Sequence, residues 1–111
     1  LYLHDGLLEN QGEHPCNTRE PKQDIVNKYE HVNVSGVRTE YNPVLETETD
    51  MRVRAEDAIR DILRSAVKNN YTRIAVVSHH NWLYALLNVS MRNAEVYRMY
   101  YSPEQLGKCI G

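Results

Sequence analysis

The clearest hydrophobic pattern lies between residues 50 and 68, where apolar side chains recur every three or four positions. Charged side chains fill the opposite face, as in an amphipathic helix that packs one stripe against a core. Thr47 and Asp50 match the Ser/Thr-x-x-acid pattern of a helix start, and Asn69 and Asn70 tolerate the left-handed geometry of a helix end. We therefore predict a helix over residues 50–68.

A short apolar run follows this helix and indicates a strand. Residues 73–78, Arg-Ile-Ala-Val-Val-Ser, are β-branched and apolar without alternation, which is typical of a strand buried on both faces. Residues 82–87 then indicate a buried helix, and residues 95–101 a further strand. The order helix, strand, helix, strand predicts a layered α/β domain.

The first part of the chain, residues 1–48, has a weaker pattern and is rich in loops. Its apolar start predicts a short strand within residues 1–9. Residues 21–30 indicate a short helix, because a proline stands at its first turn and apolar residues share one face. Residues 10–19 are expected to form a loop, and residues 31–46 lack a sustained period.

The composition is that of one small globular domain, with 111 residues of which 41% are hydrophobic and 25% charged. Such a chain is not disordered, because its apolar side chains offset the entropy of ordering. No run approaches the ~20 apolar residues that span a bilayer, and no signal peptide opens the chain. A net charge of −2 without a basic stripe disfavours nucleic acid and membrane as partners. Two cysteines are too few for a disulfide scaffold, so we expect free thiols and a cytoplasmic protein.

The sharpest chemical feature is Ser78-His79-His80-Asn81, between the predicted strand and the helix after it. Open α/β sheets bind ligands at the carboxyl ends of their strands, and a helix N-terminus there offers N–H groups to an anion. A histidine at this point can donate a hydrogen bond to phosphate or transfer a proton near neutral pH. From position alone, this role and a loop histidine bonded to a backbone carbonyl are equally favoured.

Residues 73–87 resemble the second catalytic motif of the histidine phosphatase superfamily, the phosphoglycerate mutase-like proteins, in which a strand ends in a small residue, then His, usually Gly, and a helix. Three further stretches are similar to family segments in the family's order: Leu7-Leu8-Glu9 with residues 12–19, residues 48–50 with Arg54, and residues 93–96. The first resembles the leucine-x-glutamate and Gly-x-His-Pro-Cys-Asp-x-Arg region of the fungal and protist branch. The resemblance implies an α/β fold with a layered mixed sheet and flanking helices.

The same resemblance implies phosphoryl transfer through a phosphohistidine, in a phosphatase or a mutase acting on a small phosphorylated substrate. His79 matches the family's second histidine, which binds the phosphate, and Glu9 matches the acid that protonates the leaving oxygen. Ser78, His80 and Asn81 would border the phosphate. Fixed donors stabilise the dispersed charge of the transferring group, and a carboxylic acid supplies the proton. Neither a metal nor another cofactor is implied.

Two departures from the family pattern concern the site. His80 stands where the family usually has Gly, so its side chain must point away from the phosphate or narrow the pocket. No histidine of the chain follows an arginine, so the nucleophile of the family's Arg-His-Gly motif is missing. We expect it, with the fold's N-terminal strand, upstream of Leu1. Residues 1–111 would then form a single partial domain that is inactive alone.

Other functions and other sites stay open. A catalytically inactive phosphatase-like binding or scaffolding module is the alternative that His80 favours, and an unrelated small α/β interaction domain is a third hypothesis. A metal site at His79 and His80 lacks a nearby carboxylate or cysteine, and the neighbours His14 and Cys16 rarely reach thiol–imidazole geometry. Surface or packing roles are the simpler interpretation for Arg19, Arg54, Arg98, Tyr97, Tyr100 and Tyr101. The pattern specifies neither the substrate nor the oligomeric state.

Overall fold

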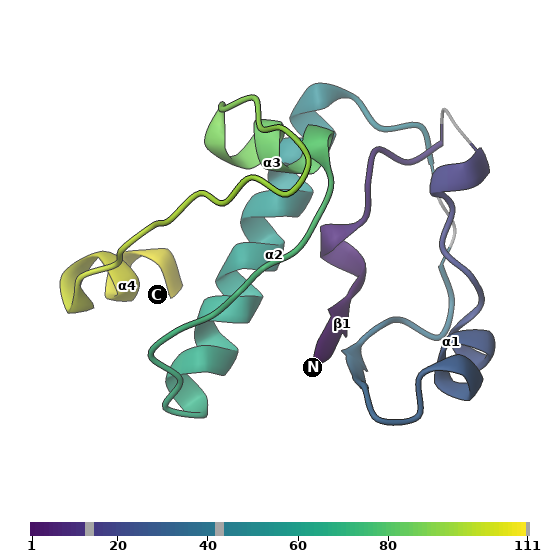
Figure 1. The fold of residues 1–111 in the computed structure, drawn as a ribbon, viewed down its shortest axis with the longest axis horizontal. Helices are drawn as coiled ribbons and strands as arrows, with labels where there is room; N and C mark the ends of the chain where they lie inside the picture. Colours follow the sequence, from purple (N-terminus) through teal and green to yellow (C-terminus); the bar gives the residue numbers. More distant parts are fainter. Residues whose placement is uncertain (13–14, 42–43, 111) are drawn as a thin grey trace.

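The fold is arranged around one long helix, α2 (Glu48–Lys68), shown in teal in Figure 1. The computed structural model describes residues 1–12, 15–41 and 44–110. The other elements are β1 (Tyr2–His4), η1 (Asp5–Leu7), η2 (Pro15–Asn17), α1 (Lys22–Lys28), β2 (Asn33–Gly36), α3 (His80–Leu87) and α4 (Pro103–Ile110). Helix α2 contacts α3, α4 and η1. No helix in these ranges is long and apolar enough to cross a bilayer.

The local signals at both ends of α2 work as predicted. Thr47 is the N-cap: its hydroxyl accepts the Asp50 N–H at 3.1 Å, and the Asp50 carboxylate accepts the Thr47 N–H at 3.0 Å. These reciprocal bonds satisfy donors that a helix start leaves without partners. At the other end, Asn70 takes a positive φ of 57°. The helix begins two residues before the predicted start and ends where expected.

Removing the cap is expected to destabilise the fold measurably. Thr47→Ala should lower the free energy of unfolding by about 1 kcal/mol, because it deletes the acceptor for the Asp50 N–H. Urea denaturation followed by far-UV circular dichroism measures the loss. Thr49→Ala is the matched control, since Thr49 is an exposed threonine of the same turn. Equal losses in the two variants would contradict the capping role.

The core lies where α2 meets α3. Met51, Ala55, Ala58 and Trp82 form the buried cluster, and Trp82 is only 1% exposed. Small alanines on α2 leave room for the large indole of α3. Helix α3 confirms the helix expected over residues 82–87, although it begins two residues earlier and only Trp82 among its residues is buried. Asn88 ends it in the left-handed conformation, with φ 55°.

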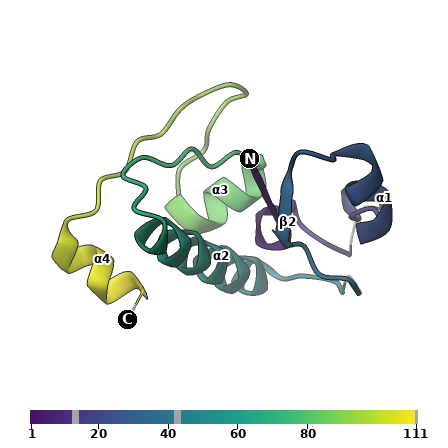
Figure 2. The same cartoon turned by 90° about the horizontal axis from the view of Figure 1, so that it is seen from below.

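The N-terminal part packs on another side of α2 as a small parallel sheet with short helices. Strands β1 and β2 pair Tyr2 with Asn33 and His4 with Gly36. Figure 2 shows α1 and β2 at the end of the molecule opposite α4. A side chain on Gly6 of η1 would place its Cβ 2.5 Å from that of Ala58, so glycine permits the close approach of η1 to α2. The mixed α/β character and the short strand within residues 1–9 are thereby confirmed.

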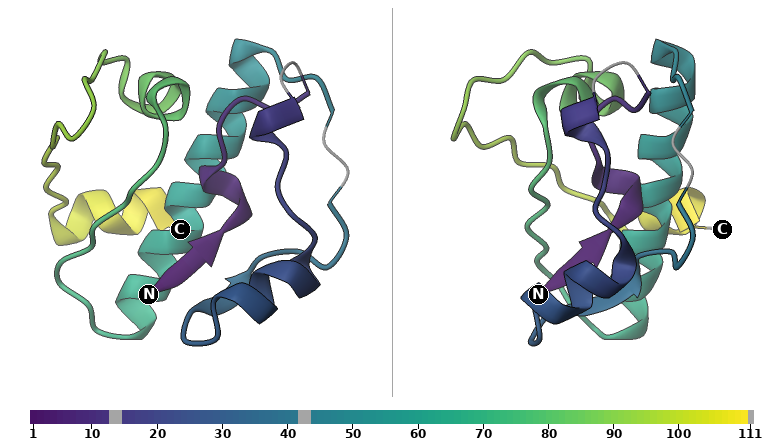
Figure 3. Two further views of the ribbon diagram at one scale, coloured as in Figure 1. Left: turned by 45° about the vertical axis from the view of Figure 1, so that its right-hand side comes forward. Right: turned by 90° about the vertical axis from the view of Figure 1, so that its right-hand side faces the viewer.

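The strands predicted over residues 73–78 and 95–101 are wrong. Neither segment belongs to a strand, and in Figure 3 both run as coil. The side chains of Val77 and Tyr100 are 85% and 83% exposed. The physical reason is the absence of a neighbouring strand among the described residues, because a strand exists only through the backbone bonds of a ladder. The sheet is consequently two-stranded, and the expected larger sheet does not form within the described ranges.

Helix α4 lies where the sequence pattern indicates no helix. Its N-terminal turn carries a local signal in Ser102, whose hydroxyl accepts the Gln105 N–H at 3.2 Å. Pro103 occupies the first position of the helix, where its missing N–H costs nothing. Arg64 of α2 donates to the carbonyl of Ile110 at 3.2 Å and so ties the last turn of α4 to α2.

Candidate functional site

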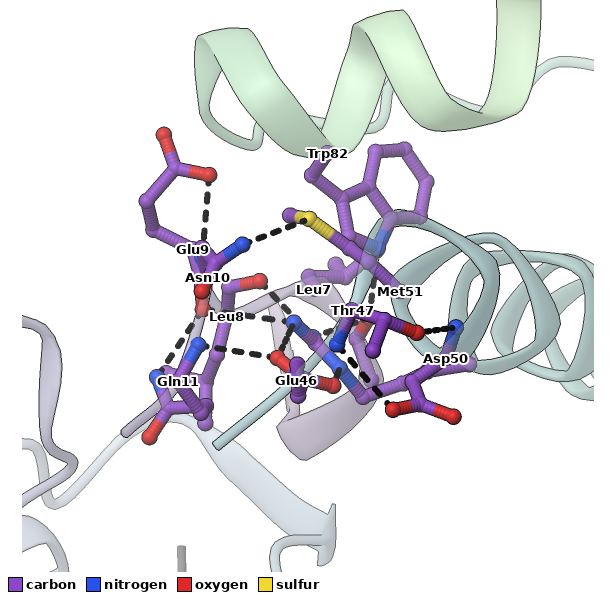
Figure 4. Close-up of polar contacts among 12 residues, drawn as sticks. Leu7, Leu8, Glu9, Asn10, Gln11, Glu46, Thr47, Asp50, Met51 and Trp82 are labelled. Carbon is purple, nitrogen blue, oxygen red and sulfur yellow. Dashed lines mark hydrogen bonds and ion pairs between the residues drawn. The ribbon is translucent and has the colours of Figure 1, made fainter. Parts of the chain in front are cut away.

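The candidate site lies at the N-terminus of helix α3, where Glu9 meets the segment that contains His79. One carboxylate oxygen of Glu9 accepts the backbone N–H of Asn81 at 3.3 Å, across 72 positions of sequence. The other accepts the N–H of Asn10 at 3.0 Å. Figure 4 shows Glu9 extending towards the ribbon of α3. Two motifs that are far apart along the chain are therefore close together in the fold.

His79 is the N-cap residue of α3. Its backbone is extended, with φ −114° and ψ 163°, and its side chain makes no capping bond. The imidazole is exposed, as are the side chains of His80 and Asn81. The first N–H groups of a helix carry a partial positive charge, which favours an oxyanion at this point. In this structure the Glu9 carboxylate binds one of those N–H groups.

Ser78 and His80 bond to the backbone on either side of the site. The Ser78 hydroxyl donates to the carbonyl of Leu7 at 2.6 Å. The Nδ1 atom of His80 lies 3.1 Å from the carbonyl oxygen of Met91. Because a carbonyl only accepts, Nδ1 carries the proton of this bond. The loop after α3 therefore holds the His80 ring, which is how this position accommodates a side chain larger than glycine.

Arg54 of α2 contributes more to the site region than the sequence suggested. Its guanidinium donates to the Glu46 carboxylate at 2.7 and 2.9 Å, and the two side chains are only 18% and 10% exposed. It also donates to three backbone carbonyls of the segment that leads to Glu9. The interpretation of Arg54 as a solvated surface arginine is wrong. Its place on the apolar stripe between Met51 and Ala55 was the signal, because a charge on a buried face must be paired.

Arg19 also departs from the surface role expected of it. Its side chain is 6% exposed, and its Nε lies 2.9 Å from the carboxylate of Asp5, which is 8% exposed. The guanidinium carbon lies 4.9 Å from the centre of the Tyr41 ring. Burial raises the pKa of that Tyr41 phenol above its ordinary value. Arg19 thus forms a buried ion pair with Asp5 inside the N-terminal part. Arg98, by contrast, is exposed, as predicted.

A separate cleft of about 430 Å³ lies between η1, β2 and α2. None of the predicted site residues lines it. His4 lies in its wall, with Nε2 3.3 Å from the Asp61 carboxylate and Nδ1 accepting the Gly6 N–H at 2.9 Å. The Nδ1 atom therefore caps η1 and the Nε2 atom joins β1 to α2. The cleft does not coincide with the chemistry that the sequence indicates.

The sequence also suggested two other chemistries, a metal site at His79 and His80 and a thiol–imidazole pair of His14 and Cys16. Within the described ranges, no group of three or more His, Cys, Asp or Glu side chains is positioned to hold a metal ion. Cys16 is an exposed free thiol, and His14, its suggested partner, lies outside the described residues.

Comparisons with family models, curated proteins and solved structures find no match to this chain. The chemistry of the site is therefore argued from its residues and geometry.

Proposed function

We propose that this chain supplies the phosphate-binding histidine and the acid of an enzyme that transfers the phosphoryl group of a small phosphomonoester through a phosphohistidine. His79 binds the phosphoryl group and Glu9 protonates the leaving oxygen, while Ser78, His80 and Asn81 border the phosphate. The observation that carries the proposal is the 3.3 Å contact between the Glu9 carboxylate and the Asn81 N–H at the start of α3.

The contact supports the proposal because it joins an acid to an anion-binding helix end. A phosphate oxygen has the same requirement as a carboxylate oxygen, namely a hydrogen-bond donor in a positive potential. Phosphate at the Asn81 N–H displaces the Glu9 carboxylate, which then lies beside the bound group. Once protonated, Glu9 can donate to the leaving oxygen, and His79 donates to a phosphoryl oxygen. Residues 1–111 contain no Arg-His pair that could supply the nucleophile of the resembled family, so we expect the chain alone to be inactive.

Phosphate binding tests the proposal without the nucleophile. We expect inorganic phosphate, titrated into the ¹⁵N-labelled chain, to shift the Asn81 amide resonance saturably. His79→Ala should abolish this shift, because it removes a donor to the phosphate. His31→Ala is the matched control, since His31 is an exposed histidine away from α3. The proposal fails if Asn81 does not respond, or if both variants respond like the wild type.

Glu9 should compete with phosphate for the Asn81 N–H. Glu9→Gln removes the negative charge while it retains the side-chain length. Two unit charges about 4 Å apart in water interact by about 1 kcal/mol, so phosphate affinity should rise about fivefold near neutral pH. The same NMR titration measures it. Glu104→Gln, at an exposed acid on α4, should leave the affinity unchanged. An unchanged or lower affinity in Glu9→Gln would show that phosphate does not replace the carboxylate.

A further inference from the structure

The backbone that carries Glu9 is held by side chains from other parts of the fold. The Gly6 carbonyl accepts from Trp82 Nε1 at 2.5 Å and from Arg54 at 3.1 Å. The next carbonyl, of Leu7, accepts from Ser78. The carbonyls of Leu8 and Glu9 accept from Arg54 at 2.7 and 3.2 Å. Four consecutive carbonyls thus take donors from α2, from α3 and from the segment between them.

Arg54 binds more carbonyls of this segment than Trp82 or Ser78 does. It bonds to the carbonyls of Gly6, Leu8 and Glu9, whereas Trp82 and Ser78 each bond to one. The guanidinium is itself fixed, because its Nε and Nη2 atoms donate to the two carboxylate oxygens of Glu46. Bidentate pairs of this kind fix direction as well as distance.

Glu46 extends this support to the other side of Glu9. The same carboxylate that binds Arg54 accepts the backbone N–H of Gln11 at 2.8 Å. In return, Gln11 donates its side-chain amide to the carbonyl of Glu9 at 2.9 Å. The backbone is therefore fixed before Glu9, at Glu9 and after it. From this fixed backbone the Glu9 carboxylate accepts the N–H groups of Asn10 and Asn81.

We propose that Arg54, fixed by Glu46, is a positioning residue that places the Glu9 carboxylate at the N-terminus of α3. The inference rests on the proposed function, in which Glu9 is the acid. Arg54 acts through the backbone and does not bind phosphate, since its donors are already used by Glu46 and three carbonyls. A lysine cannot replace it, because an ammonium is a single point of charge without the planar fork of a guanidinium.

The test reads the contact between Glu9 and Asn81 directly. Glu9→Gln should move the Asn81 amide resonance of the otherwise wild-type chain, because it replaces the carboxylate that accepts this N–H. In the Arg54→Lys chain the same substitution should move the Asn81 resonance much less, because the Glu9 carboxylate no longer lies at that N–H. Phosphate should still shift Asn81 in Arg54→Lys, with an affinity raised up to about fivefold, as in Glu9→Gln. In Arg52→Lys, a change at an exposed arginine of the same helix, the effect of Glu9→Gln should persist.

The outcomes separate the two proposals. Persistence of the Glu9→Gln effect in a folded Arg54→Lys chain overturns the positioning role. Failure of phosphate to bind the wild type overturns the proposed function, whereas the positioning role is still decided by the effect of Glu9→Gln on the Asn81 resonance. If Arg54→Lys does not fold, Glu46→Gln is the second variant, because it retains an oxygen for Arg54 but loses the charge. It should reduce the effect of Glu9→Gln on Asn81, and an unaltered effect in Glu46→Gln overturns the inference.

Discussion

Trp82→Ala should lower the free energy of unfolding by about 3–5 kcal/mol, the range for deletion of a large buried aromatic side chain. The indole is 1% exposed and belongs to the one buried cluster between α2 and α3 that the described residues form. Its Nε1–H also donates to the carbonyl of Gly6. Alanine would leave a cavity against Met51 and Ala55 and would remove that bond. Because small domains are stable by only about 5–15 kcal/mol, this loss is a large share of the total.

Chemical denaturation with two control variants separates the causes. Trp82→Phe retains most of the apolar area but loses the N–H donor, so its loss should be nearer 1–2 kcal/mol, about the value of one buried hydrogen bond. Tyr84→Ala removes an aromatic side chain that is 47% exposed on the same helix, and its loss should be smaller than that of Trp82→Ala. Equal losses for Trp82→Ala and Tyr84→Ala would contradict the assigned core.

The parts of the fold that were predicted correctly are those determined by nearby residues. The limits of α2 follow from Thr47, Asp50 and Asn70, each within a few positions of the helix end that it determines. Helix α3 ends at Asn88 for the same reason. The serine and proline that start α4 are an equally local signal, at Ser102 and Pro103, and that helix was open to prediction.

The failed predictions concern structure that depends on distant partners. Residues 73–78 have the β-branched composition of a strand, but composition reports only that a segment suits a sheet. Whether it joins one depends on a second strand, and the described residues place none beside it. The same holds for residues 95–101. The exposure of Val77 and Tyr100 is the direct consequence of this missing pairing.

The sequence predicts which residues form the candidate site better than it predicts the contacts that hold them in place. Glu9 and His79 were singled out from motifs in a particular order, and the fold brings Glu9 to the helix that His79 caps. The role of Arg54 depends on carbonyls 45 to 48 positions away, which no local pattern reveals. Ser78 was expected at the phosphate, and its hydroxyl instead donates to the Leu7 carbonyl here. Its placement at the phosphate stays a prediction.

The proposed function predicts that, in a protein combining this chain with a nucleophilic histidine, His79→Ala lowers kcat/KM for a phosphomonoester by about 10²–10³-fold, as removal of one fixed donor to a developing charge does. The donor is needed most when the phosphoryl charge is dispersed in the transition state. His31→Ala should leave turnover unchanged, because that histidine is exposed in the turn before β2. Steady-state assays of the purified variants, with folding checked by circular dichroism, measure the effect.

Glu9→Gln should separate the acid from the phosphate-binding groups. A positioned general acid contributes about 10²–10⁴-fold when the leaving oxygen needs a proton. An alkyl phosphate should therefore lose this factor in Glu9→Gln, while p-nitrophenyl phosphate, whose phenolate leaves without a proton, should lose much less. His79→Ala should slow both substrates alike, because both share the phosphoryl group. Equal losses on the two substrates in Glu9→Gln would exclude the acid role. Phosphate binding without turnover of either substrate by the wild-type product would identify an inactive binding module instead.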